Sequence, residues 1–296
     1  MPSLREIRRK IKSIKSTEQI TKAMKMVAAA RMRRSQGAIV AARPFAMKME
    51  QLVRELAVIE KVEEGGQAKP LHPFLAERAG GPAMLILVTA DKGLCGAFNS
   101  NLIKAALEWL RQHQGRKVYV AVVGRKGRDF LHRVRGFDME IVHELAGIFP
   151  KVHFSHAELL GQAAIEAFES KALSSVTIIY NEFKSVAAQK LVSAQVLPIP
   201  AFDGPAPKNL TDYDFEPGRD KLLAALLPRF IKAQLYRVLL ESQAAELAAR
   251  MNAMDAASKN AKELRQSMNL SLNRQRQAII TKEIAELVGG AEALAA

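Results

Sequence analysis

The spacing most suggestive of chemistry lies in residues 89–101, TADKGLCGAFNSN. They follow an apolar run of strand length, 84–89, and precede a helical pattern. In an α/β fold, glycine-rich loops hold phosphates at this position. Neither G-x-G-x-x-G nor G-x-x-x-x-G-K-[ST] occurs in the chain, so the glycines lack the required spacing. We therefore interpret Gly93 to Gly96 as a tight strand-to-helix turn and predict no bound nucleotide or other cofactor.

Other catalytic and metal-binding arrangements are also missing from the sequence. The single cysteine, Cys95, excludes an internal disulfide framework and has no identifiable partnering base, so we interpret it as a packed small residue. Neither H-E-x-x-H nor G-x-S-x-G occurs. His153 and His156 are three residues apart but precede a helical pattern, so we expect no metal there. We predict no catalytic, cofactor-binding or metal-binding residue, and hence no enzyme activity of the chain's own.

The elements that would position such residues alternate along the middle of the chain. Apolar runs predict strands at 84–89, 117–124, 139–143, 175–183 and 190–199. Amphipathic patterns predict helices at 100–113, 126–134 and 155–170. This alternation indicates an α/β sheet covered by helices, with the last strand returning antiparallel as a hairpin. Residues 200–218, rich in Pro, Gly and Asp, are typical of a loop.

Both ends of the chain are nearly free of helix-breaking residues. We predict one helix over 3–56, interrupted only near Pro44, and a second over 219–288. Such helices are too long for a compact domain, and their apolar faces need cover. The simplest cover is each other, in an antiparallel coiled coil. The predicted domains are therefore 1–56, 57–218 and 219–296.

The apolar spacing supports a coiled-coil seam. Leu4, Ile7, Ile11 and Ile14 step by 3, 4 and 3 residues. After a phase shift over residues 15–18 we expect the seam to resume with Ile20, Met24 and Val27. In the second helix the stripe turns to alanine between Ala244 and Ala261, which fits either close helix approach or simply the high helix propensity of alanine. Residues 265–277 carry no wide apolar stripe, and we expect them to be exposed or to touch a partner.

The basic charge of the chain lies at its two ends. Residues 1–55 carry 14 Lys and Arg against 4 Asp and Glu, a net charge of +10. Residues 56–218 carry 18 of each, and residues 219–296 carry 12 against 8, a net charge of +4. Basic ends favour an acidic partner, which could be nucleic acid, anionic lipid or protein. A basic coiled-coil protein that binds nucleic acid is the alternative function.

Long motifs at both ends and in the middle resemble one family. They are STEQITKAMKMVAAARMRRSQ (16–36), ARPFA (42–46), TADKGLCGAFNSNL (89–102), ESQAAELAARMNAMDAASKNAKEL (241–264) and NRQRQAIITKEIAELVGGAEAL (273–294). Together they resemble the gamma subunit of bacterial F-type ATP synthase, in order and over essentially the whole chain. The resemblance implies an antiparallel coiled coil plus a central Rossmann-like α/β domain. It also implies a central-stalk rotor subunit, which couples rotation of the membrane c ring to conformational changes at the catalytic sites of an alpha/beta hexamer.

The resemblance also implies which residues contact partners. The contacts to the acidic lever segment of beta would be Lys22, Met24, Lys25, Arg31 and Arg33. The polar catch on a beta loop would be Arg276, Gln277 and Thr281. The apolar tip, held in a sleeve of the hexamer, would be Ile279, Ile280, Ile284, Leu287 and Val288. The foot on the c ring would be Tyr213, Asp214 and Phe215.

The implied partners are the alpha and beta subunits, epsilon at the side of the α/β domain, the c ring and, indirectly, delta. One copy per complex and no bound nucleic acid are expected. The chain has no run of about 18 apolar residues and no pattern of a secretory signal, and we reject a transit peptide. We therefore expect a peripheral protein on the cytoplasmic face of the bacterial plasma membrane, with the proton as the default coupling ion. With one cysteine, the paired regulatory cysteines of the chloroplast version are impossible.

Overall fold

The computed structural model describes residues 3–63, 72–149, 151–200 and 218–295. The chain divides into two units, each described by itself below. One comprises Met1–Ala28 with Met251–Ala296, and the other is Ala29–Arg250. The predicted division at residues 56 and 218 stays a proposal.

The larger unit contains a five-stranded sheet. Its strands are β1 (Ala83–Val88), β2 (Val118–Val123), β3 (Met139–Leu145), β4 (Ser175–Phe183) and β5 (Gln189–Leu197). Their order in the sheet is β3-β2-β1-β4-β5, with all neighbours parallel except β4 and β5. Every residue of β1 and β2 is buried, as expected for parallel strands covered on both faces. The sequence-based prediction of an α/β sheet covered by helices, with the last strand antiparallel in a hairpin, is confirmed.

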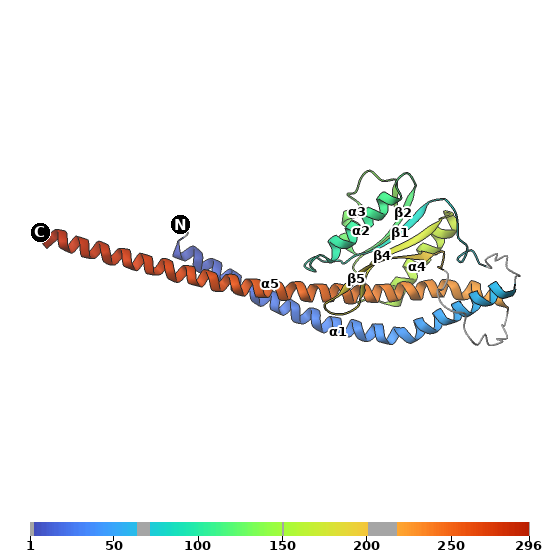
Figure 1. The fold of residues 1–296 in the computed structure, drawn as a ribbon, viewed down its shortest axis with the longest axis horizontal. Helices are drawn as coiled ribbons and strands as arrows, with labels where there is room; N and C mark the ends of the chain where they lie inside the picture. The colour runs from blue at the N-terminus through green and yellow to red at the C-terminus, as the bar shows by residue number, and fades with distance from the viewer. Residues whose placement is uncertain (1–2, 64–71, 150, 201–217, 296) are drawn as a thin grey trace. The chain divides into compact units, whose positions relative to one another are not determined.

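Helices cover both faces of this sheet (Figure 1). The helices are α2 (Phe98–Gln112), α3 (Arg125–Leu131) and α4 (Phe154–Ser170), with parts of α1 and α5. Side chains alternate along β1, so that Met84 and Ile86 pack with α1, α4 and α5, whereas Leu85 and Leu87 pack with α2 and α3. The result is two apolar cores separated by the sheet.

Helix α1 (Leu4–Glu63) is continuous, so the predicted interruption near Pro44 is wrong. A proline inside a helix removes one hydrogen bond and crowds the preceding turn. Ile39 and Met49, on either side of Pro44, are both buried in the same core. This packing holds the helix on both sides of the proline, because tertiary contacts supply most helical stability.

Helix α5 (Arg219–Ala295) contains 77 residues, which at 1.5 Å per residue corresponds to about 115 Å. It passes through Pro228 and continues beyond the predicted end at residue 288, through Gly289 and Gly290. Glycine lowers helix propensity without preventing a helix. None of the described helices is long and apolar enough to cross a membrane.

In the smaller unit, the first part of α1 pairs with the last part of α5. Lys25 Nζ lies 2.6 Å from Asp255 Oδ1, and Arg265 Nε lies 3.0 Å from Glu18 Oε2. The α5 position rises as the α1 position falls, so the helices run antiparallel. The predicted antiparallel pair is confirmed.

The turn between β2 and α3 depends on Gly124, which has φ of +90°. A Cβ at this position would lie 2.2 Å from the Thr89 carbonyl oxygen. We expect Gly124→Ala to destabilise the chain by at least about 2 kcal/mol, because backbone strain alone costs about 1–3 kcal/mol. Gly115→Ala is the matched control: Gly115 has φ of +86°, but a Cβ there meets nothing within 4 Å. Urea unfolding midpoints measure both, and equal losses would contradict the proposed clash.

Candidate functional site

Covered positions along α1 keep one 3–4 spacing from Leu4 to Val53. The residues at these positions are all buried or half-buried: Leu4, Ile7, Ile11, Ile14, Glu18, Thr21, Lys25, Ala28, Met32, Ser35, Ile39, Ala42, Ala46, Met49 and Val53. The predicted phase shift is therefore wrong. Ile20 and Val27, expected in the seam, are 59% and 51% exposed. The apolar pattern gave the wrong seam because three successive seam positions are occupied by polar residues, Glu18, Thr21 and Lys25.

These polar positions have partners of their own. Glu18 and Lys25 form the two ion pairs to α5, and Thr21 Oγ1 donates to carbonyls of its own helix. Hydrogen bonds from Lys25 and Lys259 hold the pKa of Asp255 below its ordinary value. Polar groups in a helix seam restrict the alignments that the helices can adopt. The pairs therefore determine which residues of α1 face which residues of α5.

The proposed lever residues fall in different surroundings. Lys22 is exposed and Met24 is half-buried, whereas Lys25 is engaged with Asp255. Arg31 and Arg33 are exposed and belong to the other unit. Lys25, predicted to contact beta, thus forms an ion pair with Asp255 of its own chain.

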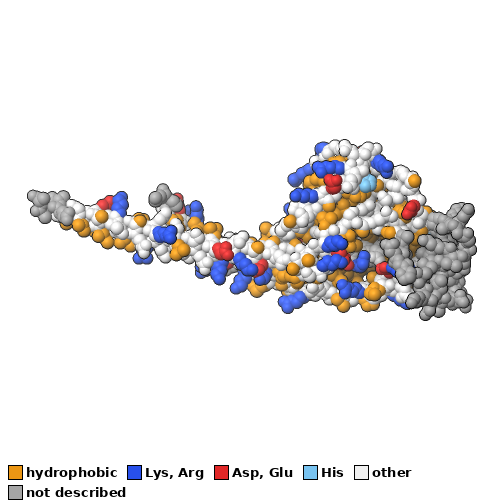
Figure 2. All heavy atoms as spheres, viewed as in Figure 1, with side chains coloured by type: hydrophobic (Ala, Val, Ile, Leu, Met, Phe, Trp, Pro, Cys, Tyr) orange, Lys and Arg blue, Asp and Glu red, His pale blue; other side chains and the backbone are white. Residues whose placement is uncertain are grey.

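The proposed catch and tip lie on an exposed stretch of α5. Every residue from 276 to 291 is exposed, including Arg276, Gln277 and Thr281. The exposed fractions of the tip side chains are as follows: Ile279 42%, Ile280 42%, Ile284 55%, Leu287 74% and Val288 53%. Figure 2 shows apolar side chains gathered along this end of α5. The foot residues Tyr213, Asp214 and Phe215 lie outside the described residues.

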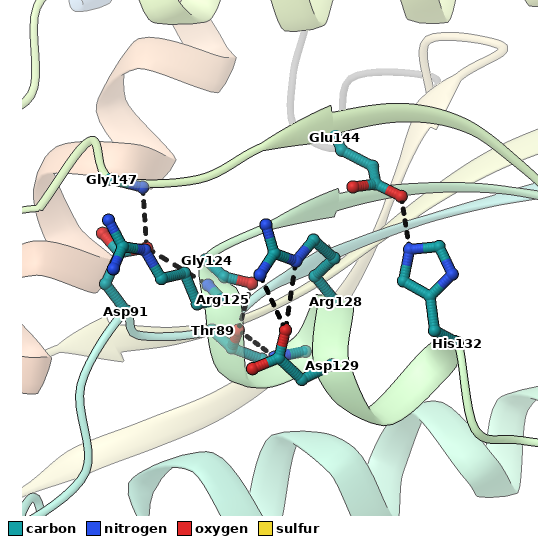
Figure 3. Close-up of polar contacts among 10 residues, drawn as sticks. Thr89, Asp91, Gly124, Arg125, Arg128, Asp129, His132, Glu144 and Gly147 are labelled. Atoms are coloured by element: carbon teal, nitrogen blue, oxygen red, sulfur yellow. Dashed lines mark hydrogen bonds and ion pairs between the residues drawn. The ribbon is translucent and has the colours of Figure 1, made fainter.

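Asp91, in the loop after β1, is bonded to two other segments of the chain (Figure 3). Asp91 accepts backbone hydrogen bonds from Arg125, Gly147 and Phe149, at 3.1, 2.8 and 3.1 Å. One of these donors, the Arg125 amide, is at the start of α3, where a carboxylate complements the helix dipole. These three amides, which belong to the segments after β2 and β3, are therefore engaged by Asp91.

The side chains of Thr89 and Asn99 form further hydrogen bonds within and around this loop. The Thr89 hydroxyl is buried, donates to the Val123 carbonyl and accepts from the Gly127 amide. Asn99 accepts from the Ala90 amide and donates to Cys95 Sγ. Cys95 is 1% exposed, and burial raises the pKa of its thiol, so it is a packed residue as predicted.

His153 and His156 complete the start of α4. His153 occupies the position before the helix, and its amide donates to His156 Nδ1 at 3.1 Å. Throughout the part of the chain that the structure describes, no three His, Cys, Asp or Glu side chains gather as metal ligands.

One contact that sequence reasoning missed joins α5 to the loop after β1. Arg250 donates to Glu246 through two nitrogens, and its Nη1 donates to the Gly93 carbonyl at 2.7 Å. Glu and Arg four residues apart in an alanine-rich helix were a detectable signal for the pair. Nothing in the sequence indicated the carbonyl 157 positions away.

Comparison with known proteins assigns the family. A family model described as ATP synthase matches residues 3–294. The ATP synthase gamma chain of Elusimicrobium minutum (strain Pei191) is 43% identical over 307 residues, covering 99% of both chains. That of Anaeromyxobacter sp. (strain K) is 44% identical, covering 99% of this chain and 100% of the relative. The chain belongs to the ATP synthase gamma chain family.

Solved structures agree with the fold of this family. A chain of the Tetrahymena thermophila mitochondrial ATP synthase central stalk and c ring matches with a TM-score of 0.62 and 27% identity. The match covers 81% of this chain and 99% of the other. A chain of the Euglena gracilis mitochondrial ATP synthase matches with a TM-score of 0.66 and 19% identity, covering 98% and 94%. The fold class inferred from the sequence is confirmed.

The Asp255 pairs make the smaller unit sensitive to acid. The pKa of Asp255 is lower in the folded chain than in the unfolded chain, so its stabilisation is present above about pH 4 and is lost as the pH falls through the folded-state value. We expect Asp255→Asn to lower the urea midpoint at pH 7 and the difference to shrink on acidification. Glu286→Gln, which removes only a pair within one helix turn, is the control. A difference that does not depend on pH would contradict the assignment.

Proposed function

We propose that this chain is the central-stalk rotor subunit of a bacterial F-type ATP synthase. The observation that carries the proposal is the full-length similarity to ATP synthase gamma chains, at 43% and 44% identity, combined with two long helices that run antiparallel. Rotation of a membrane ring would turn the chain, and the chain would present different surfaces in turn to the catalytic sites of a surrounding hexamer. Such coupling needs differential contacts in each state rather than chemistry.

The chain itself is non-catalytic in this proposal. The loop that would hold a phosphate in an α/β enzyme instead binds Asp91 to three amides and Thr89 to its neighbours. Nucleotide binding and bond-making would belong to the alpha and beta subunits. The same fold can serve unrelated functions, so the site decides between them.

Contacts to beta would come from the exposed parts of both helices. Lys22, Arg31 and Arg33 supply exposed positive charge for an acidic lever segment, with Met24 beside them in sequence. Arg276, Gln277 and Thr281 would form the polar catch on a beta loop. An exposed guanidinium suits such a catch because it can donate several hydrogen bonds in a fixed geometry.

The apolar tip needs a partner of its own. Five large aliphatic side chains between residues 279 and 288 are exposed, and such an apolar surface typically marks an interaction site. We propose that an apolar sleeve of the alpha/beta hexamer surrounds them. These side chains lie on a stretch of α5 whose residues are all exposed. Their contact with the sleeve can therefore change as the chain turns.

The remaining partners follow from membership of the complex. We propose contacts with epsilon and, through Tyr213, Asp214 and Phe215, with the c ring, while delta is reached only indirectly. One copy would serve each complex, on the cytoplasmic face of the bacterial plasma membrane, with the proton as coupling ion. The nucleic-acid alternative predicts tight, salt-sensitive DNA or RNA binding by residues 1–55.

Co-purification tests the proposed function. The tagged chain, expressed in its own cells, should bring down alpha and beta subunits in threefold excess over itself, together with ATPase activity. Recovery of the chain with nucleic acid and without the hexamer would contradict the proposal.

Met24→Lys is expected to impair coupling. It adds a cation beside Lys22 at the proposed contact with acidic beta segments. An exposed ion pair contributes about 0.2–1 kcal/mol, so the added contact would change the preference for one rotary position over the others by roughly 1.5- to 5-fold. The measurement is ATP-driven proton pumping per ATP hydrolysed in membrane vesicles. Met26→Lys is the control, because Met26 is 59% exposed on another side of α1; equal effects would contradict the assignment of Met24.

Arg276→Ala is expected to weaken ATP turnover by the assembled hexamer. Losing a hydrogen bond from a charged donor costs about 1.5–3 kcal/mol, which corresponds to roughly a tenfold loss of turnover or more. Steady-state ATPase assays on purified complex measure the loss. Arg274→Ala is the matched control, since Arg274 is also exposed on α5, two positions away. Unchanged turnover in an intact Arg276→Ala complex would remove Arg276 from the catch.

A further inference from the structure

The most enclosed stretch of α5 is unexpectedly polar. Every residue from 242 to 248 is buried, yet Ser242, Gln243 and Glu246 lie in this stretch and Glu241 immediately precedes it. The neighbouring positions are mostly alanine. Burying polar groups is costly unless they are hydrogen-bonded, so the partners of these side chains indicate what the segment does.

Two of the contacts made here reach other segments of the chain. Ser35 on α1 donates to Gln243 Oε1 at 3.2 Å. Arg250 reaches the Gly93 carbonyl in the loop after β1. Within little more than two turns, α5 is therefore bonded to another helix and to a loop.

The Arg250 contact is the more constrained of the two. The side chains of Arg250 and Glu246 are only 14% and 7% exposed. Glu246 accepts from Nε and Nη2, which fixes the plane of the guanidinium, and Nη1 then points at the Gly93 carbonyl. Burial raises the pKa of Glu246, while the adjacent Arg250 charge opposes this rise and favours the carboxylate.

Alanine supplies most of the apolar packing at residues 242–248, and Leu247 is the one larger buried aliphatic side chain among them. The hydrophobic effect is not directional, and the methyl groups of Ala244, Ala245 and Ala248 protrude little from the helix. Hydrogen bonds depend steeply on angle. A bond at the end of a braced side chain, away from the helix axis, therefore resists rotation of α5 about that axis.

We propose that Arg250, held by Glu246, is a positioning residue that transmits torque between α5 and the α/β domain through the Gly93 carbonyl. This inference rests on the proposed rotor function. The bond belongs to the chain itself, so the link can be tested in the full chain alone as well as in the complex.

The principal variant is Glu246→Gln/Arg250→Gln, which removes the bond to Gly93 without leaving one charge buried alone. The matched control is Glu108→Gln/Arg111→Gln on α2, an exposed pair three residues apart within a single helix. Arg250→Lys is a second variant that keeps the charge beside Glu246 but lacks the planar fork. If the double variant fails to fold, the lysine variant alone provides the test.

The first measurement is amide hydrogen exchange in the full-length chain. We expect exchange of the Ala90 and Phe98 amides, which donate to Asn99 Oδ1 and to the Cys95 carbonyl across the loop after β1, to rise at least fivefold in the double variant and to be unchanged in the α2 control. Unchanged exchange would show that the bond does not hold the loop, and would overturn the inference whether or not the chain is a rotor.

The second measurement uses the immobilised complex, with a bead attached through Arg116→Cys on the α/β domain. While the motor waits for ATP, the variance of the bead angle should at least double in the double variant, with a smaller increase in Arg250→Lys and none in the α2 control. Raised exchange with unchanged variance would overturn the torque role while leaving the rotor function intact. A wild-type chain that does not rotate in an active hexamer would instead overturn the proposed function.

Discussion

A helix of 60 or 77 residues persists in water only where one side is covered. Helix α1 meets this requirement through positions spaced alternately three and four residues apart from Leu4 to Val53, and α5 meets it up to the exposed stretch that begins at residue 276. In the smaller unit Glu18 and Lys25 of α1 pair with Arg265 and Asp255 of α5, and in the larger unit both helices contribute side chains to the core on one face of the sheet. This continuous cover also explains why Pro44 does not end α1, because both neighbouring turns are anchored in the same core.

Polar residues in the seam perform a different task from the apolar ones. Aliphatic contacts tolerate several alignments of two helices, whereas an ion pair exists in only one. The pairs Glu18–Arg265 and Lys25–Asp255 are partly exposed, and pairs of this kind contribute about 0–1 kcal/mol. Their role is therefore alignment more than stability. If α1 and α5 could slide along each other, the residues exposed to a partner would differ from one alignment to the next.

The α/β domain shows how a fold associated with ligand binding can serve a mechanical part. Its strand order places the loop after β1 where nucleotides bind in related architectures. Here Asp91 and Thr89 accept hydrogen bonds from the amides of Arg125, Gly127 and Gly147, which lie after β2 and β3. The same loop offers the Gly93 carbonyl to Arg250. The position that binds a ligand elsewhere thus binds other segments of its own chain.

The strands, the helices, the antiparallel ends and the family could be predicted from the sequence. They depend on local periodicity, on long motifs and on the rarity of glycine and proline at both ends. The seam of α1 could not be predicted, because Glu18, Thr21 and Lys25 occupy it in place of the expected Ile20 and Val27. The partners of Asp91 and Arg250 could not be predicted either. The physical reason is that a polar side chain is buried only where a distant partner meets it, and hydrophobic spacing along one segment contains no record of that partner.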